Sequence, residues 1–193
     1  MRGILTSIFL LFVWSVSAQK ISSKTIEKGF LMSYGYSSAE NKLQEGNYQV
    51  MMLQGRFSMD FFHRRDTIQK NKFFYKFLIG NEPQFNLVWV GSQQAWEFGI
   101  NNTLQPTFKL TERLYPYFIG STGLHFFSAT LAKQRRGFIF SNSVGVGTYY
   151  RISQRFALNG QFRIRHMSNL NTRMPNDGIN TQHFHFGMSW FVP

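Results

Sequence analysis

A histidine and a serine two positions apart, His166 and Ser168, are the residues of this chain whose types and spacing favour hydrolytic chemistry. A histidine beside a serine can take the hydroxyl proton while the oxygen attacks an acyl carbonyl, and a third polar group can hold the imidazole in the required tautomer. Asn180 follows a short loop later and is a candidate for that third group. The tripeptide His-x-Ser is common, so the spacing is weak support for an ester hydrolase. Polar residues where a strand reaches water would explain the same pattern.

Alternating apolar and polar residues around this motif predict β-strands with one apolar face. Three such strands are expected near the C-terminus, over residues 137–151, 155–169 and 181–192. Residues i and i+2 of a strand share a face, so His166 and Ser168 point to the same side as Ile164. Asn180 has the parity of Phe184. The three polar side chains are therefore expected to meet on the apolar face of two adjacent strands.

The same alternation predicts five further strands upstream. They are expected over residues 29–38, 47–62, 72–91, 94–102 and 113–127. The segment 72–91 contains NEPQ, residues 81–84, which acts either as an interruption within one strand or as a turn between two. A small closed barrel with both ends on one side needs an even strand number. We therefore treat 72–91 as one long, interrupted strand and predict an all-β fold, an eight-stranded antiparallel barrel.

The apolar face of this barrel is expected to lie in lipid. The chain of 193 residues is 43% hydrophobic and 18% aromatic, yet after its start it has no apolar run long enough for a spanning helix. A second face of Arg, Gln and His would make a poor dry core and a good lumen. Trp89, Trp96 and Trp190 are expected to be interface anchors. A transmembrane β-barrel of the bacterial outer membrane is favoured over a soluble lipocalin-like barrel.

The N-terminal segment resembles a cleaved signal peptide. Arg2 supplies a positive charge, residues 4–16 are mostly apolar, and Val16-Ser17-Ala18 has small residues where signal peptidase cleaves. An uncleaved anchor would need about 20 apolar residues. We expect a signal peptide at 1–18 and a single β-barrel domain at 19–193.

The formal net charge of +12 favours anionic partners. Nucleic acid is not expected, because an exported chain without a nucleic-acid-binding motif would not meet it. Outer-membrane lipids with phosphate groups are the better candidates. Contacts with lipid phosphate are expected from basic residues of two loops predicted to be extracellular, Lys133, Arg135, Arg136 and Arg173. The oligomeric state stays open, a homodimer included.

Metal and cofactor sites are not expected. The chain has no cysteine, and no acidic cluster is suited to calcium. His183 and His185 share the polar face, but two ligands without a nearby carboxylate fit hydrogen-bonded lumen residues better than a metal site. Glu97 is expected to face the lumen or a turn and to pair with an arginine.

The C-terminal third resembles the lipid A 3-O-deacylase family (PagL type). The sequence from His166 to Asn169 matches the family's His-x-Ser-Asn, and residues 175–179 match its Pro-Asn-x-Gly-Ile, before a final short strand. The resemblance implies an eight-stranded outer-membrane barrel that removes the 3-position acyl chain from the lipid A of lipopolysaccharide. It implies Ser168 as nucleophile and His166 as base. Asn169 and Asn176 would orient the loop or the oxyanion.

One position departs from the family pattern, which has Glu directly after Gly-Ile where this chain has Asn180. An amide oxygen can accept the imidazole N–H, but it cannot stabilise an imidazolium by charge. Asp177 is an alternative acid if the loop folds inward. Three interpretations follow: an enzyme with a Ser-His-Asn triad, a slower enzyme assisted by Asp177, or an inactive structural or adhesion barrel.

Overall fold

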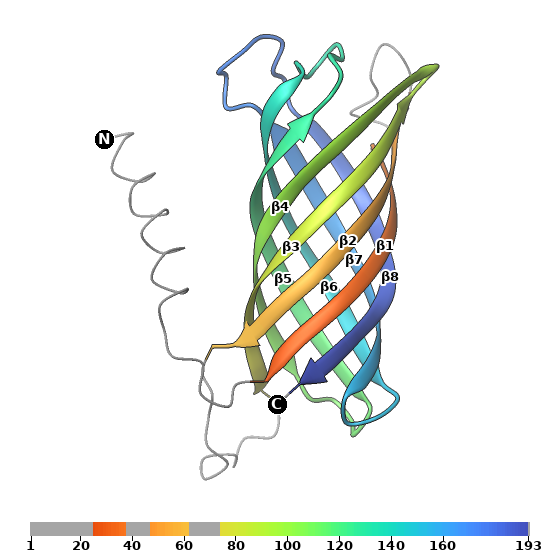
Figure 1. Cartoon of the computed structure of the whole chain (residues 1–193), viewed down its shortest axis with the longest axis vertical. Helices are drawn as coiled ribbons and strands as arrows, with labels where there is room; N and C mark the ends of the chain where they lie inside the picture. The colour runs from red at the N-terminus through yellow and green to blue at the C-terminus, as the bar shows by residue number, and fades with distance from the viewer. Residues whose placement is uncertain (1–24, 38–46, 62–73, 193) are drawn as a thin grey trace, which may run out of the picture.

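Eight antiparallel strands close into a barrel in the computed structural model, which describes residues 25–37, 47–61 and 74–192 (Figure 1). Each strand pairs with its neighbours in chain order, and the last pairs with the first. The strands are β1 (Ile26–Ser37), β2 (Tyr48–Asp60), β3 (Phe74–Val90), β4 (Gln93–Phe108), β5 (Leu114–Phe127), β6 (Gly137–Arg151), β7 (Phe156–Ser168) and β8 (Ile179–Val192). The predicted eight-stranded barrel is confirmed. The predicted signal peptide lies outside the described residues.

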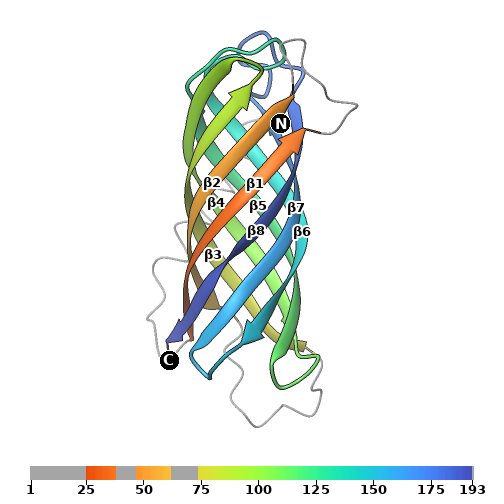
Figure 2. The same cartoon turned by 90° about the vertical axis from the view of Figure 1, so that its right-hand side faces the viewer.

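The two ends of the barrel differ. The loops 128–136 and 169–178 lie at one end, which we call the outer end, and β1 begins and β8 finishes at the other, which we call the terminal end (Figures 1 and 2). None of the described residues forms a helix long and apolar enough to cross a membrane.

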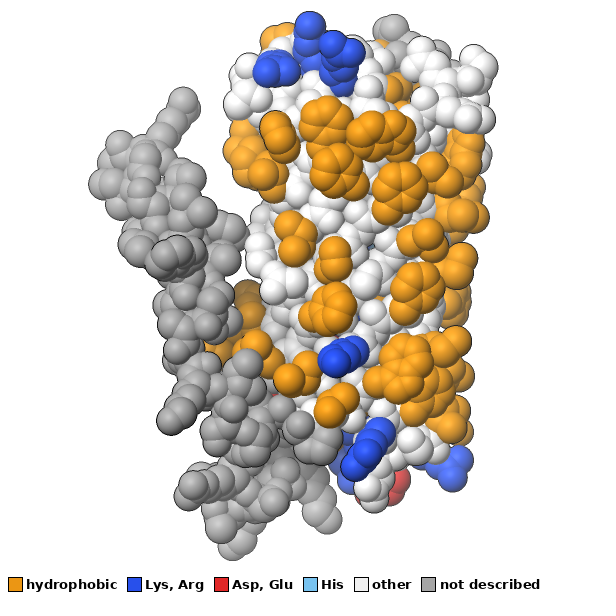
Figure 3. Space-filling view, in the orientation of Figure 1, with side chains coloured by type: hydrophobic (Ala, Val, Ile, Leu, Met, Phe, Trp, Pro, Cys, Tyr) orange, Lys and Arg blue, Asp and Glu red, His pale blue; other side chains and the backbone are white. Residues whose placement is uncertain are grey.

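Alternation along each strand separates a lipid-facing surface from a lumen. In β1, Phe30, Met32 and Tyr34 are each close to half exposed, whereas Leu31 and Ser33 are buried. Apolar side chains accordingly cover much of the outer wall (Figure 3). Exposed apolar side chains of this number need a hydrocarbon surrounding, as in outer-membrane barrels. The predicted lipid-facing parity is confirmed.

The ambiguous segment 72–91 forms the single strand β3. The residues NEPQ lie within it, and Pro83 pairs with Ile100 of β4. The ladder to β2 is interrupted where Glu82 and Pro83 would face Gly55 and Arg56, as expected for a residue that has no N–H to donate. The prediction of an interrupted strand is therefore correct, and the interruption is confined to one side.

The strand predicted over 94–102 was too short. β4 runs from Gln93 to Phe108, because its second half continues to alternate between an exposed Leu104 and buried polar residues such as Thr103 and Gln105. Polar residues that face the lumen make the end of such a strand less hydrophobic, so a prediction based on hydrophobicity ends the strand too early.

Ion pairs fill the middle of the lumen between two apolar layers. The Glu82 carboxylate is fully buried and accepts hydrogen bonds from Arg56 and Arg163, with N–O distances of 2.7–2.8 Å. A second pair joins Arg165 to Glu97, and Glu97 also contacts the His125 Nδ1 at 2.6 Å. The predicted arginine partner of Glu97 is thus confirmed. Apolar side chains such as Tyr48, Phe127 and Met167 close the outer end, and Tyr115, Tyr149 and Phe191 lie near the terminal end.

Glu82→Gln tests how much this ion-pair network contributes to the free energy of unfolding. The change removes the carboxylate that two buried arginines share, and breaking a buried ion pair costs about 3–5 kcal/mol. We expect urea unfolding of the detergent-folded protein to show a loss of that order. Glu112→Gln, which removes a largely exposed partner of Lys109, is the control and should leave the unfolding midpoint unchanged. Equal midpoints for both variants would contradict the role given to Glu82.

Candidate active site

His166, Ser168 and Asn180 come together at the outer end of β7 and β8. His166 pairs with Asn180 across the two strands, and Ser168 is the last residue of β7, opposite Phe140 of β6. His166 and Asn180 are exposed on the lipid-facing surface, and Ser168 is half-buried. The alternation of residues along the strands thus predicted correctly that His166 and Asn180 lie on the lipid-facing surface. Because β7 ends at Ser168 and β8 begins at Ile179, these side chains lie near the outer end of the barrel and not at its middle.

The imidazole of His166 is held by Asn180. The distance from Nδ1 of His166 to Oδ1 of Asn180 is 2.6 Å. An amide oxygen only accepts, so this contact requires a proton on Nδ1 and leaves Nε2 as an acceptor. That tautomer is the one a general base needs. Among the described residues no hydrogen bond joins His166 to Ser168, and such bonds are often long before substrate binds.

Asp177 is not the residue that contacts the imidazole of His166. Its side chain is exposed and makes no hydrogen bond or ion pair with the described residues, while its backbone N–H donates to the carbonyl of Lys133 at 3.0 Å. The geometry therefore favours Asn180 over Asp177 as the neighbour of Nδ1.

The loop after Ser168 is built by asparagines. Oδ1 of Asn176 accepts the backbone N–H of Asn169 at 2.8 Å, and Nδ2 of Asn176 donates to Asn171 at 2.8 Å. The Asn169 side chain is buried and donates to the carbonyl of Arg173 at 2.6 Å. These contacts hold the loop together, and a catalytic role for the two asparagines stays a prediction. They also occupy the N–H of the residue after the serine, so it is not free to hold an oxyanion.

Gly178 forms a wall of the site. Its φ of +76° is favourable for glycine and costly for other residues. A Cβ at this position would lie 2.6 Å from Cε1 and 3.2 Å from Nε2 of His166. The Gly-Ile pair of the motif therefore makes room for the imidazole, a function that the sequence alone did not indicate.

A row of polar side chains on the lipid-facing surface continues from His166 across β6 to β5. Asn142 of β6 pairs with His166, and Thr122 of β5 pairs with Asn142. The Thr122 hydroxyl donates to Oδ1 of Asn142 at 2.7 Å, and the amide N–H groups of Asn142 donate to no other side chain among the described residues. Neither residue was predicted from the sequence, although each interrupts an otherwise mostly apolar face at an even position.

Aromatic rings cover the outer wall beside this row. Trp96, Phe98 and Phe126 stack with centroids 5.7–5.9 Å apart, and Phe138 meets Phe126 edge to face at 5.7 Å. Phe138 is 67% exposed, as expected for a side chain that faces lipid. This aromatic cluster, Trp96, Phe98, Phe126 and Phe138, extends from β4 to β6, the neighbour of the strand that carries Ser168.

The basic loop residues lie on two loops that are joined to each other. A β-bridge links Gln134 to Asn176, and the backbone N–H of Arg135 donates to the carbonyl of Pro175 at 3.0 Å. Lys133, Arg135, Arg136 and Arg173 therefore share the outer end with Ser168, where basic side chains gather in Figure 3. Asp177 is the one carboxylate in these two loops. Their contact with lipid phosphate stays a prediction.

His183 and His185 face the lumen and are buried. Nε2 of His183 lies 2.6 Å from the Thr181 hydroxyl, and the two ring centroids are 5.9 Å apart. Within the described ranges no group of three or more His, Cys, Asp or Glu residues could hold a metal ion.

Comparison with known proteins gives one family match. The family model described as lipid A 3-O-deacylase (PagL) matches residues 67–189. The crystal structure of the outer membrane enzyme PagL is similar, with a TM-score of 0.59 and 14% identity over 82% of this chain and 97% of that one. Neisserial surface protein A, NspA, has a TM-score of 0.53 and 12% identity over 90% of this chain and 99% of its own. A search of the curated proteins gives no match.

Gly178→Ala tests the wall behind the imidazole. The added methyl group would strain the backbone and displace His166, and a misplacement of about 1 Å can cost on the order of 100-fold in rate. We expect a loss of that order in hydrolysis of a long-chain acyl ester in detergent. Gly120→Ala is the matched control, since a Cβ there meets no atom within 4 Å. Equal rates for the two variants would show that Gly178 does not position the base.

Proposed function

The chain belongs to the lipid A 3-O-deacylase family and lies in the bacterial outer membrane, and from this premise we propose that it removes the 3-O-linked acyl chain from lipid A by a serine–histidine mechanism. The observation that carries the proposal is the 2.6 Å contact between Nδ1 of His166 and Oδ1 of Asn180. His166 lies two residues before Ser168 in β7. With the proton on Nδ1, Nε2 of the neutral imidazole can accept a proton, and Ser168 lies on the same side of β7 as His166.

The proposed reaction has two halves. Nε2 of His166 takes the proton of Ser168 as Oγ attacks the acyl carbonyl, and the tetrahedral intermediate then expels the 3-hydroxyl of the sugar, which receives that proton from the imidazolium. A water molecule, activated by Nε2, next attacks the acyl-enzyme. The products are a fatty acid and a lipid A with a free 3-hydroxyl, and the serine regains its proton.

Asn180 is proposed to fix the tautomer without supplying charge. Replacing a triad aspartate by asparagine lowers kcat about 10⁴-fold where the amide imposes the wrong tautomer. Here Oδ1 and not Nδ2 faces the imidazole, so the tautomer is correct and the missing term is the electrostatic stabilisation of the imidazolium. We therefore expect a working enzyme that is slower than one with a carboxylate at this position.

The oxyanion would be held by side-chain amides. Because the Asn169 N–H is used within the loop, the second hydrogen on Nδ2 of Asn176 is the candidate donor that the motif offers. The free N–H groups of Asn142, next to His166 on the other side, could bind a second ester or amide carbonyl of the same lipid.

The position of the site suits a substrate that lies in the outer leaflet. The aromatic cluster offers an apolar surface to acyl chains beside Ser168. The basic residues of loops 128–136 and 169–178 lie above it, where phosphate groups of lipid A would be. Ester groups lie between chains and phosphates in such a lipid, at the level of the polar row.

A second candidate function is a structural or adhesion barrel that keeps the motif without activity. The observation in its favour is Asn180, since no carboxylate of the described residues contacts His166. The likeness to NspA shows the barrel fold and nothing about activity.

Ser168→Ala tests the proposal. The detergent-folded protein would be incubated with lipopolysaccharide, and the lipid A would be examined by mass spectrometry. We expect the loss of one 3-hydroxyacyl chain with the unmodified protein and no loss with the variant, because the nucleophile is absent. Unchanged lipid A with the unmodified protein at several pH values would favour the inactive barrel.

Asn180→Glu tests the third role. A carboxylate beside Nδ1 would stabilise the imidazolium, so we expect the deacylation rate to rise at least tenfold, less than the ~10⁴-fold of a triad in which the tautomer is also wrong. Asn142→Asp is the comparison: it adds a carboxylate on the other side of His166, away from the Asn180 that contacts Nδ1, and it removes the amide donors of Asn142, so its rate should not rise. No change in Asn180→Glu together with a large loss in Asp177→Ala would transfer the third role to Asp177.

A further inference from the structure

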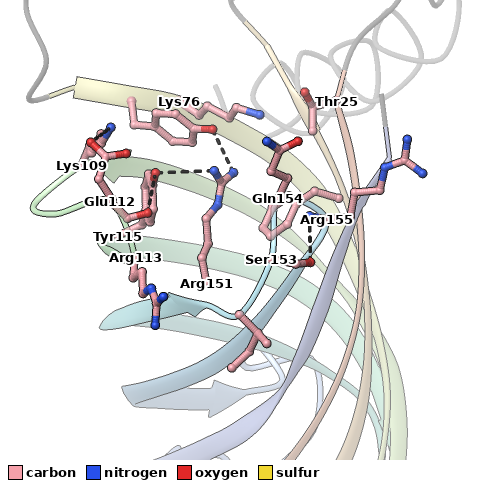
Figure 4. Close-up of a pocket in the computed structure, with 13 residues that line it drawn as sticks. Thr25, Lys76, Lys109, Glu112, Arg113, Tyr115, Arg151, Ser153, Gln154 and Arg155 are labelled. Atoms are coloured by element: carbon pink, nitrogen blue, oxygen red, sulfur yellow. Dashed lines mark hydrogen bonds and ion pairs between the residues drawn. The ribbon is translucent and has the colours of Figure 1, made fainter.

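The terminal end of the barrel contains a recess of about 720 Å³, remote from the candidate active site (Figure 4). Strand ends and two turns form its wall, 109–113 between β4 and β5 and 152–155 between β6 and β7. In an outer-membrane barrel the short turns lie on the periplasmic side. The recess therefore opens toward the periplasm.

The recess ends blindly inside the barrel. Tyr115, Tyr149 and Phe191 pack together near its base, with Tyr149 and Phe191 edge to face at 5.5 Å. Beyond them the lumen is filled by the pairs of Glu82 with Arg56 and Arg163. A blind recess of this kind suits binding and not conduction.

Positive charge dominates the lining. The recess has five basic residues and one carboxylate. The basic residues are Lys76, Lys109, Arg113, Arg151 and Arg155. Glu112 is the carboxylate, and Lys109 donates to it at 2.7 Å, which raises the pKa of Lys109. The remaining four cations are not neutralised by a carboxylate of the described residues.

Arg151 is fixed in place by aromatic rings. Its guanidinium carbon lies 4.5 Å from the ring centroid of Tyr115, 5.3 Å from that of Tyr75 and 5.6 Å from that of Phe191. Nη2 donates to the Tyr75 hydroxyl at 2.9 Å and Nη1 to the Tyr115 hydroxyl at 3.5 Å, as the dashed lines in Figure 4 show. These contacts orient the side chain, and none of them comes from a carboxylate of the residues that the structure describes.

The other arginines of the lumen are arranged differently. Arg56 and Arg163 share Glu82, and Arg165 has Glu97. Arg151 has aromatic rings and tyrosine hydroxyls in place of a carboxylate among the described residues. A half-buried cation that is held by aromatic rings, with no carboxylate partner in the described part of the chain, has the properties of an anion-binding group.

We propose that this recess binds a phosphate group presented from the periplasmic side, with Arg151 as the central ligand. A planar guanidinium can donate two parallel hydrogen bonds to phosphate oxygens, and Lys76 and Arg155 lie on the same recess to add charge. A phosphate monoester carries more than one negative charge at neutral pH, which suits several cations around one recess. The phosphate could belong to a soluble ester or to a phospholipid headgroup of the inner leaflet.

Calorimetric titration of the full, detergent-folded protein tests this. One arm uses inorganic phosphate and glycerol 3-phosphate as probes. A second arm uses nanodiscs that contain the protein in phosphatidylcholine with or without phosphatidylglycerol, read by the phosphorus NMR linewidth of the anionic lipid. Succinate at equal concentration measures carboxylate binding, and added salt should weaken the interaction.

Arg151→Gln removes the positive charge and the paired N–H donors of the guanidinium. Arg151→Lys keeps the charge but lacks the paired donors. Lys28→Gln is the matched control, because it removes one exposed positive charge of β1 that does not line the recess. Circular dichroism and urea unfolding verify that each variant is folded. Because the measurement is binding at the terminal end, it is independent of whether lipid A is deacylated at the outer end.

We expect saturable binding of one phosphate probe, weakened at least tenfold in Arg151→Gln, less in Arg151→Lys and not in Lys28→Gln. Binding in the first arm identifies a soluble phosphate, and binding in the second alone identifies a lipid headgroup. Absence of binding in both arms overturns the proposal. So does binding of succinate as tight as that of phosphate, or binding that persists unchanged in a folded Arg151→Gln.

Discussion

The ion pair between Arg165 and Glu97 fixes which face of β7 carries the candidate site. Arg165 points into the lumen, and the next residue, His166, must therefore point to lipid. A slip of one residue would move Arg165 into hydrocarbon and His166 into the lumen, so the pairing register is strongly specified. Arg163, two residues before Arg165, is held in the lumen in the same way by Glu82. The buried charges thus determine the orientation of residues that they do not touch.

With the register fixed, the outer end supplies the rest of the site. The strand ends at Ser168, and the asparagine-built loop returns the chain so that Asn180 lies opposite His166. Gly178 allows this approach because it has no side chain to displace the imidazole. Polar groups on the lipid-facing side are tolerated near the interface and costly at mid-membrane. A hydrolase of membrane lipid needs its site at that level, since the ester it cleaves lies there.

The sequence predicts the barrel, the face of each strand and the meeting of His166 with Asn180, because a period of two and the strand order determine them. The length of β4 escaped prediction, since Thr103, Gln105 and Thr107 face the lumen and make its second half resemble a loop. The polar row of Thr122 and Asn142 escaped as well, because one polar residue in an apolar face is informative only when its cross-strand neighbours are known. The cage around Arg151 joins residues of four strands, and sequence spacing carries no signal for such a contact.

The central claim is that Ser168 is a nucleophile activated by His166, and covalent labelling tests it most directly. A long-chain alkyl fluorophosphonate in detergent micelles would be added to the folded protein, and the modified peptide would be located by mass spectrometry. We expect one adduct, on Ser168, and its loss in His166→Ala while the barrel stays folded. An unlabelled Ser168, or labelling at an equal rate without His166, would show that His166 does not activate Ser168 as a nucleophile.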